Sequence, residues 1–290
     1  TIDTVKCTGC GLCVEVCKDF SLIIKENKAV LSPTPLFGCI GCGHCMAICP
    51  TEAITINGRT LSPNDLIALP QNIVNNHQQL FAMMQHRRSI REFTTQSVAS
   101  EDIDKILEAA QTAPMGLPPS DVHVLVLHGK DKTAAFAQSF SEYLKSLRFM
   151  TSEPFLRLMR PFWGKANDQL FRGFVKPMFK AYTNEMDKGI NLINYDAPLA
   201  MYFYGSPFSD PADPIVAATY AMLAGETLGL GTCMLGAVHP LIQNGRRAAN
   251  FRKNHGIKYK SREGLFVVFG HPKVKYQKGI KRTFASIDMG

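Results

Sequence analysis

The sequence lacks any uninterrupted apolar run near the roughly 20 residues that a membrane helix needs, so no transmembrane segment is predicted. It also lacks a basic motif interleaved with aromatic side chains, which gives no reason to expect a nucleic-acid partner. No secretory leader is recognisable, and this favours a reducing, cytoplasmic setting. With 46% hydrophobic residues among 290, the chain instead has the composition of a globular protein with room for more than one core.

Acidic residues are outnumbered by basic ones. The sequence has 24 Asp and Glu against 32 Lys and Arg, which gives a formal net charge of +8. Most of the basic excess lies beyond residue 75. A basic surface in that part of the chain favours acidic electron carriers or anionic cofactors as partners.

Cysteine is scarce outside two short runs, which hold eight of the nine cysteines. The runs are "CTGCGLCVEVC" at 7–17 and "CIGCGHCMAIC" at 39–49, and each cysteine of the first has a counterpart 32 positions further on. A short apolar alternation follows each run, at 22–24 and at 54–56. We infer an internal repeat whose strands pair over one shared core.

Three chemistries compete for these thiols. Disulfides are disfavoured because C-x2-C neighbours would close strained local loops. A zinc ribbon needs two C-x2-C pairs per ion and leaves the third cysteine of each run without a purpose. Two C-x2-C-x2-C-x3-C runs instead match the pattern for a pair of cubane iron–sulfur clusters, in which three thiolates of one run hold one cluster and the fourth ligates the other.

Residues 1 to about 60 therefore resemble a bacterial-type two-cluster 4Fe-4S ferredoxin. The resemblance implies two [4Fe-4S] clusters, the first held by Cys7, Cys10, Cys13 and Cys49 and the second by Cys39, Cys42, Cys45 and Cys17. Pro50 follows the second run as the motif expects, whereas Lys18 stands where the first run should be followed by proline. This departure removes no ligand. His44, between two ligands of the second run, is expected to face solvent.

Turn-forming residues separate the repeat from the rest of the chain. We predict a ferredoxin domain at 1–62, a linker at 63–75 and a second domain at 76–290. Helices in the second domain are expected at 76–88, 100–113 and 214–230, with a long helical stretch from about 131 to 188. Strands are expected at 122–128, 198–205, 232–235 and 264–270. The predicted fold class is α+β, with a small ferredoxin-type domain followed by a three-layer α/β/α domain.

Several segments of the second domain stand in a recognisable order. "RRSIREF" at 87–93 clusters Arg87, Arg88 and Arg91 around Ser89, and such donors suit a phosphate. It is followed by "AAQTAPMGLPPSDVHVLVL", "YDAPLAMYFY", "AGETLGLGTCMLGAVHP" and "FVVFGHPKVKYQKGIKR". Together these segments resemble the FMN-dependent nitroreductase family, and the resemblance covers most of residues 80–290.

That resemblance implies FMN as a cofactor and assigns its contacts. Arg87, Arg88, Ser89 and Arg91 would grip the FMN phosphate and the edge of its ring, with Lys278 and Arg282 completing the phosphate site. A backbone amide of Leu235, Gly236 or Ala237 would hydrogen-bond the flavin N5. The turn formed by Pro114, Met115 and Gly116 would come from the partner subunit of an intertwined homodimer with FMN at its interface. After this turn the sequence departs from the family, since 118–122 reads Pro-Pro-Ser-Asp-Val.

The fused ferredoxin indicates how electrons arrive. Iron–sulfur clusters pass single electrons, whereas FMN stores two. We predict an oxidoreductase that takes electrons from a low-potential donor such as ferredoxin or flavodoxin through two clusters to FMN. It would reduce a small organic acceptor: a nitroaromatic, a quinone or an activated double bond. The alternative is a relay between protein partners without turnover of a small molecule. No side chain is assigned a catalytic role, and direct reduction by NAD(P)H is left open.

Residues 141–182 are atypical of the nitroreductase family. The stretch holds the sole tryptophan, Trp163, with many Phe and Met residues and an excess of Lys and Arg. Packing over the flavin or across the dimer is the expected role. A lid over an apolar acceptor is the sharper hypothesis, and contact with a membrane surface is a third. Elsewhere, Cys233 and the histidines at 123, 239 and 255 are expected to be structural, with His239 closest to the flavin loop.

Overall fold

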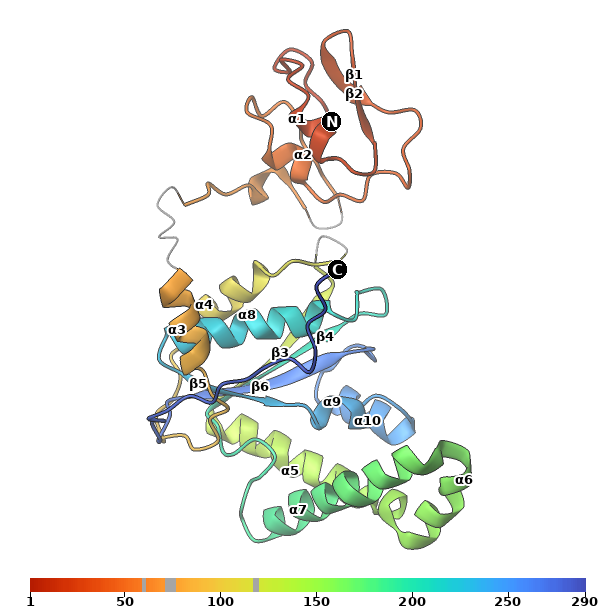
Figure 1. Cartoon of the computed structure of the whole chain (residues 1–290), viewed down its shortest axis with the longest axis vertical. Coiled ribbons are helices and arrows are strands. Elements are labelled where there is room, and N and C mark those ends of the chain that lie inside the picture. The colour runs from red at the N-terminus through yellow and green to blue at the C-terminus, as the bar shows by residue number, and fades with distance from the viewer. Residues whose placement is uncertain (59–60, 71–76, 117–119) are drawn as a thin grey trace. The chain divides into compact units, whose positions relative to one another are not determined.

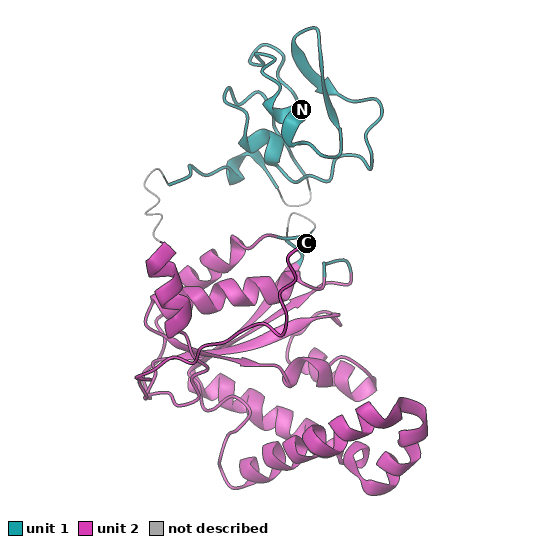
Figure 2. Cartoon of the chain, in the orientation of Figure 1, with its two compact units in different colours: residues 1–75, 115–121, 208–210 teal, residues 76–114, 122–207, 211–290 magenta. Residues whose placement is uncertain are grey.

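The computed structural model of the chain describes residues 1–58, 61–70, 77–116 and 120–290. These residues form two compact units, which Figure 2 shows in different colours. Unit 1 comprises residues 1–75, 115–121 and 208–210, and unit 2 comprises residues 76–114, 122–207 and 211–290. Part of the predicted linker, from residue 71 on, lies outside the described residues, as do Pro118 and Pro119. The domain boundaries at 62 and 76 stay predictions.

Unit 1 contains two short helices, a hairpin and a 3-10 turn (Figure 1). In chain order these are α1 (Leu12–Val16), β1 (Leu22–Lys25), β2 (Lys28–Leu31), α2 (His44–Ala47) and η1 (Pro63–Asp65). Both cysteine runs start their helix in the same way. Gly11 and Gly43 precede α1 and α2 with φ of 81° and 77°, a left-handed conformation that glycine adopts without a steric penalty. The internal repeat is therefore present in the backbone as well as in the sequence.

Strand pairing in unit 1 differs from the prediction that 22–24 pairs with 54–56. β1 pairs instead with β2 in antiparallel register, and Ile54 forms only an isolated bridge to Ile2. The reason is local, because residues 26 and 27 both adopt positive φ and close a two-residue hairpin whose twist suits the flanking strands. The shared core is nonetheless formed, since Leu22 and Ile54 are buried in the same cluster.

Four antiparallel strands form the sheet of unit 2, in the order β3–β4–β6–β5. They are β3 (Val122–His128), β4 (Leu199–Gly205), β5 (Gly231–Leu235) and β6 (Gly264–Gly270). Every residue of the two central strands, β4 and β6, is buried. Their short continuous apolar runs are typical of strands covered on both faces, and the predicted strands at 122–128 and 264–270 agree with β3 and β6.

Helices cover both faces of this sheet (Figure 1). On one face lie α3 (His77–His86), α4 (Ser100–Gln111) and α8 (Asp213–Thr227), and on the other lie α5 (Lys130–Ser146), α9 (Val238–Leu241) and α10 (Arg246–Asn254). This arrangement is the three-layer α/β/α sandwich that the sequence predicts. Across the described residues, no helix combines the length and apolar character needed to cross a membrane.

The long helical stretch expected from about 131 to 188 is helical over most of its length, but it is divided into several elements. The stretch holds α5, η2 (Arg148–Thr151), α6 (Glu153–Leu170), the π-helical turn η3 (Phe171–Val175) and α7 (Lys176–Asp187). Pro154 lies in the first turn of α6, where proline is tolerated, and it separates α6 from what precedes. Within α6 the backbone leaves helical geometry at Gly164, with φ 78° and ψ 174°, shortly after Pro161. Glycine and proline therefore fold this segment back on itself.

Residues 89–93 lie along the free edge of β5 and the segment after β6. Ser89 bridges Thr232 in a parallel sense, and the Ile90 N–H donates to the Thr232 carbonyl at 2.9 Å. Ile90 is 6% exposed and packs on Gly231, where an added Cβ would lie 2.6 Å from Ile90 Cγ1. The absence of a side chain at position 231 thus lets this segment approach the sheet.

Replacing Gly231 tests this close approach. Gly231→Val should destabilise the fold by about 1–3 kcal/mol, because the new side chain overpacks a buried contact with Ile90. Urea unfolding followed by circular dichroism measures the change. Gly173→Ala is the matched control, since no atom lies within 4 Å of its added Cβ, and its unfolding midpoint should stay the same or rise slightly. Equal midpoints for the two variants would contradict the packing argument.

Candidate cofactor sites

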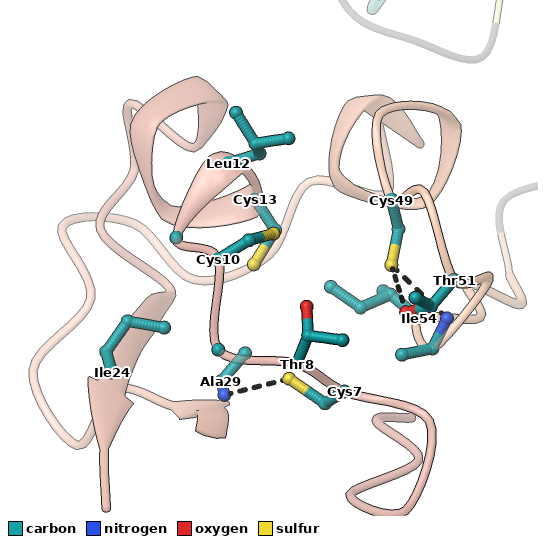
Figure 3. A pocket seen from close by; sticks show the side chains of 13 residues that line it. Cys7, Thr8, Cys10, Leu12, Cys13, Ile24, Ala29, Cys49, Thr51 and Ile54 are labelled. Carbon is teal, nitrogen blue, oxygen red and sulfur yellow. Dashed lines mark hydrogen bonds between the residues drawn. The ribbon is translucent and has the colours of Figure 1, made fainter. Parts of the chain in front are cut away.

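One cavity of unit 1 is lined by Cys7, Cys10, Cys13 and Cys49, the four residues that the ferredoxin pattern assigns to one cluster. Figure 3 shows Cys10 and Cys13 at the start of α1, Cys7 beside Ala29 and Cys49 after α2. The Ala29 N–H donates to Cys7 Sγ at 3.3 Å, and the Ala53 N–H donates to Cys49 Sγ at 3.2 Å. Such hydrogen bonds stabilise thiolates and tune the potential of a cluster that they ligate.

A second cavity of unit 1 gathers the other quartet. Its lining includes Cys17, Cys39, Cys42 and Cys45, together with Lys18 and His44. Both cavities therefore include one cysteine from the other run, Cys49 in the first and Cys17 in the second. The second cavity is the larger, at about 380 Å³ against about 20 Å³.

The thiols within each quartet interact electrostatically. Burial, with smaller contributions from the neighbouring Cys42, Cys17 and Cys39, raises the pKa of Cys45 to about 11. Burial likewise raises the pKa of Cys13, with smaller contributions from Cys7 and Cys10. Burial also acts to raise the pKa of Cys49, but hydrogen bonds from the Ala53 and Thr51 backbone and from the Thr51 side chain outweigh it, so this pKa is lowered. Thiolates gathered in this way need a cationic centre to stay ionised together.

Among the described residues, no three His, Cys, Asp or Glu side chains lie close enough to share one metal ion. That finding concerns a single ion. A cubane cluster brings its own core of iron and sulfide, so its cysteines stand around a cavity and each holds a different iron. Two cavities that each carry four soft thiolate ligands fit that chemistry.

In unit 2, residues 87–91 present an anion cradle, which we define as the side chains of Arg87, Ser89 and Arg91. Alternate residues of an extended chain point to the same side, and this trio shares the Cys233 side of the segment. Ser89 and Arg91 both reach the Cys233 thiol, and Arg87 lies near it. Burial raises the pKa of this thiol, while Arg91 and Ser89 oppose the rise.

The anion cradle contains a hydrogen-bond donor that has no acceptor among the described residues. Arg87 Nη1 is buried and has no hydrogen-bond partner among the described residues, although a buried guanidinium nitrogen ordinarily finds an acceptor. Two guanidinium groups and a hydroxyl on one side of the chain match the oxygens of a phosphate. The donor set therefore fits the phosphate-bearing cofactor that the sequence resemblance implies.

Arg88 and the C-terminal tail lie beside each other on a different side of this segment. Arg88 Nη1 donates to the Arg87 carbonyl at 2.7 Å, and Arg88 Nη2 lies beside Gly279. The structure thus separates Arg88 from the anion cradle with which the sequence groups it. Residues 271–290 contain no helix or strand and carry the predicted phosphate contacts Lys278 and Arg282, both exposed, past Arg88.

The predicted flavin loop leaves its backbone accessible. Leu235 ends β5 and is buried, Gly236 is exposed, and Ala237 precedes α9. No atom lies within 4 Å of the position that a Gly236 Cβ would occupy, so a flat ring can approach the main chain here. The predicted turn at 114–116 divides between the units, with Pro114 in unit 2 and Met115 and Gly116 in unit 1.

Two tyrosines next to the anion cradle were not predicted. Arg91 Cζ lies 5.8 Å from the centre of the Tyr195 ring. The charge of Cys233 raises the pKa of Arg91, and a hydrogen bond with Tyr195 makes a smaller contribution in the same direction. Burial raises the pKa of Tyr182 to about 12. Tyr195 and Asp196 adopt φ of 57° and 52°, and such left-handed non-glycine residues concentrate at functional sites. The "YDAP" motif was the sequence signal, but it indicated no contact with Arg91.

Comparisons with known proteins identify both parts of the chain. The nitroreductase family matches residues 84–271, and a 4Fe-4S dicluster domain matches residues 6–54. The chain therefore belongs to the nitroreductase family. It is a nitroreductase-like oxidoreductase with a ferredoxin-type domain on the N-terminal side, as the sequence predicts.

Solved structures resemble the chain in fold. A nitroreductase with bound FMN from Bacteroides fragilis has 17% sequence identity and a TM-score of 0.53, with 73% of this chain and 99% of that chain covered. A nitroreductase with bound FMN from Desulfitobacterium hafniense has 21% identity and a TM-score of 0.51, with 72% and 98% covered. At these identities the likeness is one of fold. Among curated proteins, no match to the sequence was found.

The atypical segment at 141–182 includes an arm formed by α6, η3 and α7. Trp163 stacks on Phe171 with ring centres 4.4 Å apart, and its indole nitrogen is buried without a hydrogen-bond partner among the described residues. Glu153 joins the start of α6 to η3 and to the start of α7, pairing with Arg172 at 2.6 Å and with Lys176 at 2.5 Å. Tyr182 of α7 also interacts with Tyr195, Cys233 and Arg91. The charge of Arg91 thus influences a residue of the arm, and the role of the arm as a lid stays a prediction.

Acid should loosen the arm through Glu153. Hydrogen bonds from Lys176 and Arg172 lower the pKa of Glu153 to about 2 from its ordinary 4.5. Its contribution to stability is therefore present above pH 4.5 and is lost as the pH falls towards 2. Because Trp163 is the sole tryptophan, its emission maximum during acid titration reports the change.

Variants separate this ion pair from general acid effects. Glu153→Gln should remove the part of the Trp163 transition between pH 4.5 and 2 and leave a looser arm at neutral pH. Glu142→Gln, which removes the surface partner of Lys145 on α5, is the control and should titrate as the parent does. A Glu153→Gln titration that overlays the parent curve would show that this ion pair does not hold the arm.

Proposed function

We propose that the chain is an iron–sulfur flavoprotein oxidoreductase in which two [4Fe-4S] clusters and FMN carry electrons from a low-potential protein donor to a small organic acceptor. The observation that carries the proposal is the gathering of each predicted cysteine quartet, with its member from the other run, in its own cavity of unit 1. Unit 2 adds the anion cradle and the open backbone at Gly236.

The two cavities support the proposed cluster ligands. Cys7, Cys10, Cys13 and Cys49 would hold one cluster, and Cys39, Cys42, Cys45 and Cys17 the other. When bound, the clusters and FMN supply one-electron and two-electron chemistry respectively. The protein's own contribution is to gather the four cysteines of each quartet and to donate the backbone hydrogen bonds from Ala29 and Ala53 to the sulfurs of the first quartet.

FMN is proposed from the family and from the donors present. Arg87, Ser89 and Arg91 would bind the phosphate, and the backbone of residues 235–237 would line the ring. The FMN bound to the solved nitroreductases of similar fold supports this choice. We also propose a homodimer with FMN at its interface, to which the 114–116 turn contributes. The acceptor belongs to a class that takes two electrons: nitroaromatics, quinones or activated double bonds.

Retention of FMN tests the anion cradle. Arg87→Met and Arg91→Met should each weaken FMN binding by tenfold or more, because each removes a charge-assisted contact to phosphate, worth roughly 1.5–3 kcal/mol. Arg88→Met is the matched control, since Arg88 lies against Gly279 and outside the anion cradle. Flavin released by heat and measured by fluorescence gives the occupancy. Loss of FMN from Arg88→Met alone would contradict the assignment.

Rapid kinetics test the electron route. The protein loaded with both cofactors is mixed anaerobically with reduced ferredoxin or with NADPH, and flavin bleaching is followed by stopped-flow absorbance. Reduced ferredoxin should bleach the flavin rapidly in the parent. A Cys17→Ala, Cys49→Ala variant that keeps its FMN should lose this phase, because each substitution removes a ligand of one cluster.

Iron content and the second reductant are the controls for that experiment. The parent should contain about eight iron atoms per chain, as two [4Fe-4S] clusters require, and the double variant should contain fewer. If NADPH bleached both proteins equally and ferredoxin bleached neither, the clusters would not be the point of entry. Parent protein whose flavin is reduced by ferredoxin but reoxidised by no acceptor would favour an electron relay.

A further inference from the structure

A chain of buried polar side chains includes His239, which follows the predicted flavin loop by two residues. Tyr202 of β4, His239 of α9, Gln243 and Ser261 are between 0% and 6% exposed. Tyr202 Oη lies 2.9 Å from His239 Nδ1, and Gln243 Nε2 lies 3.2 Å from Tyr202 Oη. The Ser261 N–H donates to Gln243 Oε1 at 3.0 Å. We call these four residues the His239 network.

The positions of the hydrogen atoms in the His239 network can be assigned from the groups that can only accept a hydrogen bond. His239 Nε2 lies 3.3 Å from the Arg262 carbonyl, which can only accept, so Nε2 carries the proton. Nδ1 of the neutral ring is then an acceptor, and the Tyr202 hydroxyl donates to it. The Gln243 amide donates one hydrogen to the His239 carbonyl at 3.0 Å and the other towards Tyr202 Oη. Each donor is thus matched to an acceptor.

The imidazole has little freedom to move. A Cβ at Gly264 would lie 2.7 Å from His239 Nδ1 and 2.8 Å from the Phe203 carbonyl, so the ring fills the space that a side chain at 264 would take. Burial lowers the pKa of His239, which agrees with a neutral ring that uses both nitrogens. The imidazole is therefore fixed between β4, β6 and the segment before β6.

His239 stands two residues beyond Ala237, the last residue of the predicted flavin loop. α9 has four residues, Val238–Leu241, and a single helical turn fixes its own position poorly. The position of α9 therefore depends on the contacts of its side chains, and the hydrogen bonds of the His239 network provide such contacts. Gly236 itself is exposed, with open space at its Cβ position, so the loop has no packing of its own on that side.

We propose that His239, held by Tyr202 and Gln243, is a positioning residue that fixes the backbone of residues 235–237 for contact with FMN. This rests on the proposed binding of FMN at that loop. A backbone held in its binding conformation before the ligand arrives loses less freedom on binding. If the loop contacts oxidised and reduced flavin to different extents, loosening it also changes the potential, by about 30 mV for each tenfold change in the ratio of the two affinities.

FMN titration of the full-length chain tests the proposal. After removal of its FMN, each protein is titrated with FMN, and the flavin midpoint potential is measured by reductive titration with a reference dye. His239→Phe should weaken FMN binding about tenfold, because it leaves the Tyr202 hydroxyl and the Arg262 carbonyl unsatisfied. His239→Gln, which keeps one donor and one acceptor, should recover part of the loss. The midpoint potential should change in His239→Phe and return towards the parent value in His239→Gln.

A second buried histidine provides the matched control. His255 is half-buried, bonds Ser139 Oγ through Nε2 at 2.8 Å and packs on Phe136 and Phe251, away from the 235–237 loop in sequence. His255→Phe should lower the unfolding temperature while FMN affinity stays within about twofold of the parent. If His255→Phe weakens FMN binding as much as His239→Phe does, the effect is general destabilisation and the proposal fails.

Tyr202→Phe gives a second route when His239→Phe does not fold. It keeps the aromatic ring and removes only the hydroxyl, so it should weaken FMN binding in the same direction by a smaller factor. The double variant with His239→Phe should lose less FMN affinity than the sum of the two single effects, because both substitutions remove the same Tyr202–His239 hydrogen bond. FMN affinity equal to the parent's in both Tyr202→Phe and His239→Gln would overturn the proposal. Parent protein that binds no FMN would instead overturn the proposed function.

Discussion

The constraint on which unit 1 depends is the exchange of one cysteine between the two runs. Cys17 lies with the second quartet and Cys49 with the first, so neither cavity can form from one run alone. The core between the runs is small, with seven buried residues, and a module of this size needs a staple beyond hydrophobic burial. Clusters bound across both runs would act as that staple, which joins cofactor loading to folding.

Unit 2 depends on a close packing contact, in which Ile90 lies against the backbone of Gly231 where no side chain is present. That approach sets the register of residues 87–91 beside β5, and the register decides which side chains face Cys233. A shift by one residue would exchange Arg87, Ser89 and Arg91 for Arg88 and Ile90. The side chains of the anion cradle are therefore selected by packing on the opposite side of the same segment, where Ile90 is buried.

Sequence reasoning reached the parts that local pattern determines. The cysteine spacing gave the two quartets that line the cavities, although their role as ligands stays a prediction, and the apolar runs gave β3 and β6. Sequence reasoning failed where a tertiary contact or a short turn determines the structure. β1 pairs with β2, the next strand in the sequence, through the hairpin at 26–27, and Gly164 interrupts the helix of the arm. The His239 network joins residues that lie up to 59 positions apart, from 202 to 261, and no periodicity connects them.

The proposed combination of clusters and FMN places a particular requirement on the flavin site. Electrons that arrive singly must be paired before a two-electron acceptor can take them, so a flavin in this role has to be held in more than one oxidation state. Side chains that bind only one state would trap it there. Under the proposed function, backbone amides of the loop at 235–237 and guanidinium groups confined to the phosphate would avoid that trap. Under the proposed function, the main chain of residues 235–237 would contact the flavin, and the buried His239, two residues beyond, would hold that backbone in place.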